Sequence, residues 1–234
     1  MKIEYKYTTT GCRLVFDKNG THTFGGDSPK IKFSGKKLNQ TLHHFLSIDL
    51  SDSNSPIKAE GIEKVPLLYP LKNSGGGGEL QYQIISNEEI MIHHISDFDE
   101  ENFVNHNQFP SKNVIFQALD YKTERILHAV NGGFDRDLNE EDTSLIKDCD
   151  NGMPIRIGGN IESCQGKLFA YCKNPECANK EWNCNIPIIV LCPAAEWINK
   201  FTSIDTWGEY PEDVEFCFGI CQDCGTIHVE NMCG

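Results

Sequence analysis

The sequence predicts an α+β protein dominated by antiparallel β-sheet, and three observations carry this prediction. Short segments with alternating apolar and polar residues recur along the chain, clear helical periodicity is confined to one segment, and two parts of the chain repeat the same order of features. With 234 residues, of which 39% are hydrophobic, the chain can bury a substantial core as one large domain or two closely packed small ones.

Five segments are expected to form strands. Residues 80–84, 155–157 and 214–220 alternate between apolar and polar side chains, which suits a sheet with one buried face. The runs at residues 65–71 and 186–192 are apolar almost throughout, so they predict central strands that are covered on both faces.

One short helix and one glycine-rich turn are expected between these strands. Residues 194–201 predict the helix, because Trp197, Ile198 and Phe201 share one face at helical spacing. Residues 75–78 are four consecutive glycines, which are too flexible for a strand and indicate a turn. A phosphate-binding loop is the alternative, but the lysine and hydroxyl of a P-loop do not follow.

The repeated order of features predicts two duplicated sheet modules related by a pseudo-twofold axis. Each segment begins at a glycine pair, passes through an apolar run and ends in a strand preceded by glycine: Gly25-Gly26, residues 45–50 and residues 78–84, then Gly158-Gly159, residues 188–191 and Gly208 with residues 214–220. We therefore expect an N-terminal module over 1–130 and a C-terminal module over 131–234. Chance similarity is the alternative.

The acidic charge of the chain indicates the class of its partner. The formal net charge is −13 and the isoelectric point is about 5.0, which disfavours nucleic acid or an anionic membrane and favours a basic protein. Acidic residues gather in two stretches, and six of them are candidate partner-binding residues: Asp97, Asp99, Glu100, Glu101, Glu140 and Glu141. The alternative is that these stretches are ordinary solvated loops. The sequence leaves the oligomeric state open.

Cysteine usage predicts reduced thiols in a cytoplasmic protein. The first seven residues carry charges at alternate positions and lead into no apolar run, so we expect neither a secretory signal nor a transmembrane span. The chain has 11 cysteines, an odd number that fits a disulfide framework poorly without secretory features. Metal binding is then the leading use for clustered thiols.

Four cysteines form two closely spaced pairs that predict a structural zinc site. Cys172 and Cys177 flank a turn that contains Pro175, and Cys221 and Cys224 precede a glycine. Two such turns can present four thiolates to one ion in a tetrahedron, so the metal would staple the C-terminal module together and leave no open coordination position.

The sequence leaves other roles for the cysteines open. One of the four ligands could be replaced by a neighbour in the sequence, namely Cys184, Cys192 or His228. The second pair could instead be a redox motif, although no thioredoxin-like βαβ pattern precedes it. The cysteines without paired spacing are expected to be small buried apolar residues: Cys12, Cys149, Cys164, Cys217 and Cys233.

Catalytic signatures are weak. The sequence has two adjacent histidine pairs, His43-His44 and His93-His94, but neighbouring residues on a strand point to opposite faces and cannot easily share one ion. The common motifs of serine hydrolases, zinc proteases and nucleotide-binding enzymes are absent from the sequence. A cysteine–histidine hydrolase assembled from distant residues is still conceivable.

The ordered motifs resemble the YwqG-like family, whose suggested distant relatives are programmed cell death protein two and ribosome-assembly chaperones. The resemblance lies in residues 23–29, the apolar segment 45–50, Ile157-Gly158-Gly159 with Gln165, and the two cysteine pairs. The chain departs from the family pattern because no Trp precedes a proline after the first glycine pair, and the second pair lacks its proline. The resemblance implies a duplicated α+β fold, no catalytic residues to transfer, and binding of a client protein.

We therefore expect a non-catalytic protein that binds a basic client, either as a chaperone for a ribosomal protein or as an immunity protein that neutralises a toxin. The alternatives are a Cys/His-dependent or metal-assisted hydrolase, and a zinc-stabilised scaffold with apolar partner contacts.

Overall fold

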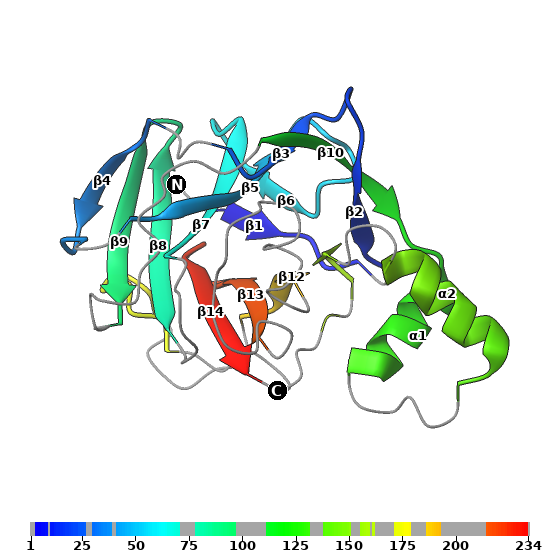
Figure 1. The fold of residues 1–234 in the computed structure, drawn as a ribbon. Coiled ribbons are helices and arrows are strands. Elements are labelled where there is room, and N and C mark those ends of the chain that lie inside the picture. The colour runs from blue at the N-terminus through cyan, green and yellow to red at the C-terminus, as the bar shows by residue number, and fades with distance from the viewer. Residues whose placement is uncertain are drawn as a thin grey trace.

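A computed structural model describes residues 3–8, 10–26, 30–38, 41–70, 78–96, 111–131, 138–150, 155–159, 161, 171–178, 186–192 and 214–233 of the chain. The predicted antiparallel β-sheet is confirmed, because β-strands dominate these residues and nearly all of them pair antiparallel. In Figure 1, β4, β9 and β8 lie on one side of the molecule and the two helices on the other.

The strands of the N-terminal half are β1 (Ile3–Tyr5), β2 (Cys12–Phe16), β3 (His22–Phe24), β4 (Lys32–Gly35), β5 (His43–Asp49), β6 (Ile57–Ala59), β7 (Lys64–Tyr69), β8 (Glu79–Ser86), β9 (Glu89–Ile95) and β10 (Lys112–Ala118). The helices α1 (Tyr121–Asn131) and α2 (Glu140–Asp150) follow. The remaining strands are β11 (Arg156–Ile157), β12 (Ile188–Cys192), β13 (Val214–Ile220) and β14 (Ile227–Cys233). All five segments predicted as strands lie in or overlap strands of this set. The expectation of a single buried face is wrong for residues 155–157 and 214–220, because every residue of both segments is buried.

Twelve strands form one sheet in the order β4-β9-β8-β14-β13-β12-β11-β2-β10-β3-β5-β7, and β1 pairs separately with β6. Within the large sheet, β4 and β9 are parallel and the other neighbours are antiparallel. Segments on both sides of residue 130 contribute to this sheet, and residue 130 itself lies in α1. The division into modules 1–130 and 131–234 stays a prediction.

The strand order is symmetric about the pair formed by β2 and β10. Outward from this pair, β2 is followed by β11, β12 and β13, and β10 is followed by β3, β5 and β7. The register is similar on both sides, because Phe24 at the end of β3 pairs with Lys112, the first residue of β10, and Ile157 at the end of β11 pairs with Cys12, the first residue of β2. The correspondence covers three strands on each side, and β14, β8, β9 and β4 continue the sheet beyond β13.

The two glycine pairs occupy corresponding positions in this arrangement. Gly25 follows β3 and donates its N–H to the carbonyl of Phe45 at 2.9 Å, and Gly158 follows β11 and donates to the carbonyl of Ile189 at 2.9 Å. Phe45 and Ile189 are also the extra residues of a β-bulge, since the ladders β5–β7 and β12–β13 change register there. Each glycine pair therefore follows a strand and donates a hydrogen bond to the bulge residue of the neighbouring strand.

The two helices were not predicted, and the predicted helix at 194–201 lies outside the described residues. Both described helices begin at a side-chain cap: Asp120 accepts from the N–H of Thr123 at 2.8 Å, and Asn139 accepts from that of Asp142 at 2.9 Å. The acidic stretch at Glu140 is therefore the first turn of a helix, where the macrodipole favours negative charge, and not a loop. Neither helix in the described part of the chain is long and apolar enough to cross a membrane.

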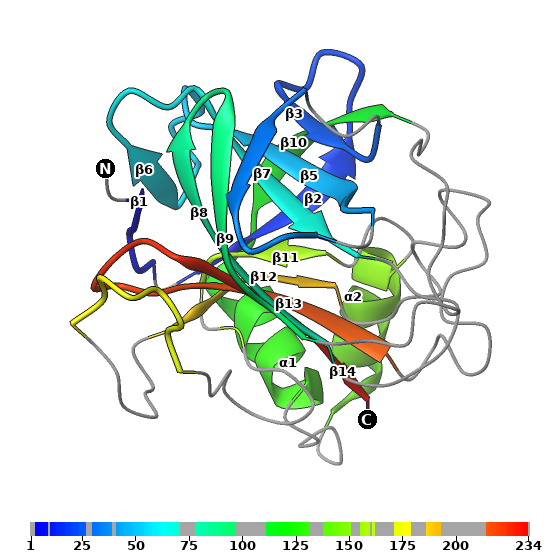
Figure 2. The ribbon, with the colours of Figure 1, turned by 90° about the vertical axis from the view of Figure 1, so that its left-hand side faces the viewer.

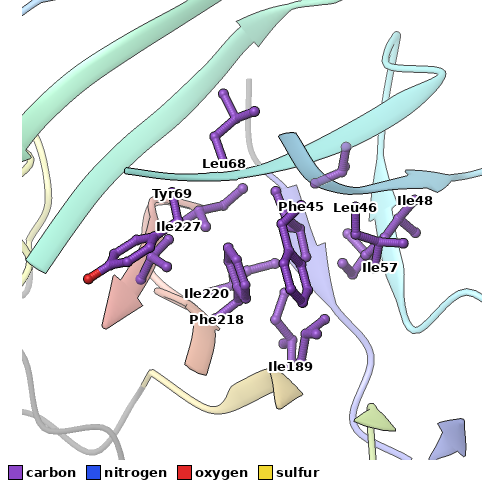
Figure 3. Close-up of a cluster of buried hydrophobic side chains, with 14 of the residues drawn as sticks. Phe45, Leu46, Ile48, Ile57, Leu68, Tyr69, Ile189, Phe218, Ile220 and Ile227 are labelled. Carbon is purple, nitrogen blue, oxygen red and sulfur yellow. The ribbon is translucent and has the colours of Figure 1, made fainter. Parts of the chain in front are cut away.

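The core lies where the β5–β7 end of the sheet packs against β13 and β14, and Figure 2 shows β5 and β7 above β13 and β14. The ring of Phe45 stacks on that of Phe218 with centroids 5.2 Å apart, and Tyr69 meets Phe216 edge-on at 5.0 Å. Figure 3 shows Phe45 beside Phe218, with Leu68 of β7 above the two rings and Ile189 of β12 below them. Aromatic packing therefore joins strands from opposite sides of the symmetric order.

Polar side chains inside this core are hydrogen-bonded. The hydroxyl of Tyr82 donates to the carbonyl of Pro66 at 2.9 Å and accepts from the N–H of Leu68 at 3.0 Å. The hydroxyl of Tyr69 donates to Asn231 Oδ1, which lies 2.8 Å away and also accepts from Gly78 N–H. These bonds satisfy polar groups that burial would otherwise leave unpaired, and they tie β7 to β8 and β14.

Replacing Phe45 by alanine is expected to lower the free energy of unfolding by about 3–5 kcal/mol, because it leaves a cavity among aromatic rings. The exposed Phe33 of β4 supplies the control, since Phe33→Ala removes the same atoms from a site that is 37% exposed and should cost under about 1 kcal/mol. Urea unfolding measures both values, and equal losses would contradict the described core.

Candidate metal centre

The second cysteine pair lies on the turn between β13 and β14. Cys221 donates its N–H to Thr226 at 2.8 Å and accepts from the N–H of Gly225 at 2.8 Å, which closes the turn and presents two thiols. Gly225 has φ of 74°, and a Cβ built there would lie 2.6 Å from the backbone nitrogen of Ile3. Only glycine fits this position, because both the backbone conformation and the contact with β1 exclude a side chain.

The first cysteine pair lies on the segment 171–178. The N–H of Cys177 donates to the carbonyl of Asn174 at 3.1 Å, and the side chain of Asn174 accepts from the N–H of Glu176 at 3.0 Å. Asn174 is buried and Pro175 follows it, so the tight turn between the two thiols is fixed by local hydrogen bonds and by a restricted φ.

The structure brings the four predicted ligands together. Their sulfur atoms all lie within 4.8 Å of one another, with Cys172 and Cys224 3.5 Å apart and Cys177 and Cys221 3.7 Å apart. Four thiolates at about 2.3 Å from a central ion would lie about 3.8 Å apart in a regular tetrahedron. Three of the cysteines are buried and Cys224 is partly exposed. This group can therefore hold one metal ion.

One sulfur of the cluster is already polarised toward the thiolate. The pKa of Cys224 is lowered because the thiols of Cys172 and Cys221 hydrogen-bond to it, and Thr226 Oγ1 lies 3.0 Å from the same sulfur. Hydrogen bonds within the cluster and burial raise the pKa of Cys172, so the lowered pKa belongs to one sulfur of the group, and metal binding would require the other thiols to lose their protons.

Two glutamines of β8 hold the segment 171–178 and the β13–β14 turn against the sheet. Gln81 is fully buried, accepts from the N–H of Lys173 at 2.6 Å and donates to the carbonyl of Tyr171 at 2.6 Å. Gln83 donates to the carbonyl of Cys224 at 3.2 Å. In the sequence these glutamines are recognisable only as the polar positions of a strand, and no local pattern reveals that the buried Gln81 and the partly buried Gln83 support the candidate metal centre.

The side chain of Asn174 connects the two cysteine turns directly. Its Nδ2 donates to Thr226 Oγ1 at 3.1 Å, and Thr226 is itself buried. The supporting network therefore joins three parts of the chain that are distant in sequence, and it orients the backbone around the sulfur atoms.

None of the three predicted replacement ligands belongs to the sulfur cluster in the described residues. Cys192 lies in the main core on β12, and Cys184 falls outside the described residues. His228 is fully buried on β14 and is not part of the cluster, and burial lowers its pKa to about 4. Neither ring nitrogen of His228 has a hydrogen-bond partner among the described residues.

The remaining cysteines are scattered. Cys217 is fully buried and packs beside the cluster, and Cys12 is half-buried on β2 with a pKa raised by burial to about 11. The side chains of Cys149, Cys164 and Cys233 lie outside the described part of the chain.

The candidate partner-binding acids are only partly described. Asp97, Asp99, Glu100 and Glu101 fall outside the described residues. Glu140 and Glu141 are exposed in the first turn of α2, and Glu141 lies 2.7 Å from Lys122 Nζ at the start of α1. The structure therefore places two of the six acids on one exposed helix end.

The histidine pairs contribute no shared ion site in the described residues. His93 Nε2 lies 3.3 Å from Gln83 Oε1, and His94 Nε2 lies 3.4 Å from Glu79 Oε2.

Glu230 lies on β14, opposite Glu79 of the paired strand β8. Burial and the negative charge of Glu79 raise the pKa of Glu230 to about 7.

Comparison with protein-family models, with curated proteins and with solved structures finds no match for this chain. The candidate site is therefore interpreted from its own geometry.

Replacing Cys177 by serine is expected to abolish binding of one zinc ion per chain and to lower the melting temperature by roughly 6–12 °C, which corresponds to about 3 kcal/mol for a chain of this size. Elemental analysis and thermal unfolding measure the two effects. Cys12→Ser is the matched control, because Cys12 is half-buried but lies outside the cluster. Equal zinc content in the two variants would contradict the site.

Replacing Glu230 by glutamine is expected to stabilise the protein at pH 8 by about 2 kcal/mol and to leave it nearly unchanged near pH 4.5. Because the folded-state pKa is raised from 4.5 to about 7, the wild-type protein loses stability as the pH rises through this window. Urea unfolding at both pH values measures the difference. Glu63→Gln, at an exposed position, is the control, and a pH-independent effect of Glu230→Gln would contradict the shifted pKa.

Proposed function

We propose that this chain is a zinc-stabilised, non-catalytic binding protein for a basic protein client. The observation that carries the proposal is the convergence of Cys172, Cys177, Cys221 and Cys224 within 4.8 Å. Four soft thiolates in a tetrahedral arrangement favour zinc, and such a site is typical of structural metal.

The proposed zinc ion acts as a staple. Its ligands come from the segment 171–178 and from the β13–β14 turn, so the metal would fix a segment without regular secondary structure to the turn that joins two interior strands of the sheet. Four protein ligands leave no coordination position for water, which argues against metal-assisted hydrolysis at this site. The metal thus supports a surface and does not activate a nucleophile.

The acidic composition supports a basic partner. The net charge of −13 would speed the approach of a basic protein and disfavours nucleic acid. The described part of the proposed surface lies where α1 and α2 begin: Glu140 and Glu141 are exposed there, and Tyr121 is 68% exposed. An exposed aromatic ring among carboxylates offers apolar contact area and charge together.

A basic partner can displace Lys122 from its salt bridge with Glu141 at this surface. Lys122 lies 2.7 Å from Glu141 and 3.7 Å from Asp142, and its side chain is 50% exposed. Ion pairs of this exposure contribute little to stability, so a cation of the client can compete with Lys122 for the same carboxylates. Asp97, Asp99, Glu100 and Glu101, which fall outside the described residues, are proposed as further partner-binding residues.

The proposed architecture is a gene-duplicated pair of modules of the YwqG-like kind. Support comes from the symmetric strand order around β2 and β10, from the matching hydrogen bonds of Gly25 and Gly158, and from the matching bulges at Phe45 and Ile189. The proposed role of a protein with this architecture is that of a client chaperone or of a toxin-neutralising immunity protein in the cytoplasm.

Affinity purification of the tagged full chain at low salt, followed by mass spectrometry, tests the client. We expect a basic protein that is released by a high-salt wash, because surface charge attraction is screened within about 8–10 Å at physiological ionic strength. Recovery of nucleic acid or of an acidic protein instead would overturn the proposed partner class.

The double variant Glu140→Gln and Glu141→Gln is expected to lower the association rate with that client about three- to tenfold at low salt while leaving the fold intact. Glu60→Gln with Glu63→Gln removes the same charge from two other exposed positions and is the control. Stopped-flow or surface-based kinetics measure the rates. Unchanged association of the Glu140/Glu141 variant would remove this surface from the proposal but would leave the metal site untouched.

A further inference from the structure

A polar hollow lies beside the first glycine pair, away from the cysteine cluster. Its volume is about 380 Å³, which is within the range of small-molecule sites. Seven described residues line it, and they offer hydroxyl groups, an imidazole and an ammonium group but no carboxylate: Thr23, Gly25, Gly26, His44, Ser47, Lys64 and Ser111. The chemistry of this lining therefore favours an anion.

A β-bulge aims two of these side chains into the same space. On a regular strand, residues three apart point to opposite faces. The bulge at Phe45 inserts one residue between His44 and Leu46, so His44 and Ser47 share a face and His44 Nε2 lies 3.0 Å from Ser47 Oγ. The Cα of Gly26 faces the same ring, because a Cβ built there would lie 3.9 Å from His44 Nδ1.

The second ring nitrogen of His44 has capacity for a ligand. His44 is only 6% exposed, and its Nδ1 has no hydrogen-bond partner of normal geometry among the described residues. Burial lowers the pKa of His44, the nearby ammonium group of Lys64 lowers it further, and the carbonyl of Gly25 partly offsets these effects. An anion that binds beside this buried imidazole favours its protonated form.

The corresponding position in the other half of the sheet already holds an oxyanion. Gly159 corresponds to Gly26, and a Cβ built on Gly159 would lie 2.5 Å from Glu124 Oε1. The same carboxylate accepts from Arg156 Nη2 at 2.7 Å and from the N–H of Gly11 at 3.3 Å. Gly11 lies beside Gly159 and directly precedes β2, just as Ser111 lies beside Gly26 and directly precedes β10. The second glycine pair therefore borders a carboxylate that the chain itself supplies.

The first glycine pair has the same backbone setting, and the described residues that line its hollow include no carboxylate. Its cation is Lys64, which is exposed and belongs to β7. The nearest acid across the β5–β7 ladder is Asp49, which pairs with Lys64 but directs Oδ1 to Ser51, whose hydroxyl lies at 2.6 Å and whose N–H lies at 2.9 Å. Asp49 lines a neighbouring hollow and not this one.

We propose that the hollow beside Gly25 and Gly26 binds the phosphate group of a small phosphorylated ligand. Lys64 supplies the charge, the hydroxyls of Ser47, Thr23 and Ser111 supply hydrogen bonds, and the absence of a side chain at Gly26 lets the oxyanion approach as Glu124 approaches Gly159. A protonated His44 donates from Nε2 to Ser47 and from Nδ1 to the ligand, so binding takes up a proton.

Titration of the full chain with sodium sulfate tests the site, with NMR signals of His44 as the readout. Sulfate is a suitable probe because it keeps two negative charges between pH 5 and 8, so any pH dependence comes from the protein. We expect saturable shifts and an affinity that rises on the order of tenfold from pH 8 to pH 5.5, because the bound dianion stabilises the imidazolium. Asp49 pairs with Lys64 across the β5–β7 ladder, and hydrogen bonds from Ser51 lower the pKa of Asp49, so this carboxylate stays ionised across the window and does not mimic the effect.

Two variants decide the proposal. Lys64→Gln is at an exposed position and should fold normally, and we expect it to weaken sulfate binding on the order of tenfold. Lys32→Gln removes the same charge from exposed β4 at the opposite edge of the sheet and should bind as the wild type does. His44→Gln should lose the pH dependence.

Inorganic phosphate should compete with sulfate at pH 7. Absence of saturable binding by the wild type, or equal weakening by Lys64→Gln and Lys32→Gln, would overturn the site. Because the cysteine cluster is remote in sequence and has its own readout in zinc content, failure of this proposal leaves the proposed metal staple and client unaffected.

Discussion

The antiparallel pairing of β2 with β10 holds the large sheet together at its centre. On one side of this pair are β3, β5 and β7, and on the other are the strands from β11 to β4. Without it the hydrogen-bonded sheet would divide into two parts, joined through core contacts such as the stacking of Phe45 on Phe218 and the hydrogen bonds of Tyr69 and Tyr82. Because the registers on both sides correspond, this one pairing also sets where the two glycine pairs lie.

The metal centre depends on the sheet as much as on its ligands. Each cysteine turn is closed by its own backbone hydrogen bonds, but Gln81 and Gln83 of β8 bring the two turns to the same place. Buried amide groups of this kind must be satisfied, so the glutamines and the segment 171–178 constrain each other. The polar side chains of β8 therefore support the cysteine turns, and the apolar side chains of the same strand belong to the core.

The two glycine pairs show how one backbone arrangement can carry two different electrostatic environments. At Gly159 the carboxylate of Glu124 is fixed by Arg156, which gives a buried ion pair with 4% and 5% side-chain exposure. At Gly26 the cation is exposed and the surrounding groups are hydroxyls and an imidazole. The first arrangement is closed and stabilising, whereas the second leaves polar groups directed at an open hollow.

The sequence by itself determined the strands whose side chains alternate and the two cysteine turns, because both depend on residues that are close together in the chain. It did not determine α1 and α2, whose caps at Asp120 and Asn139 stabilise acidic segments with little apolar periodicity. Only the tertiary structure decided that cysteines 44 residues apart would meet, that Gln81 would be buried beneath them, and that His44 and Ser47 would share a face. These features follow from strand register and from a bulge, which are set by a partner strand elsewhere in the sequence and not by the local residues.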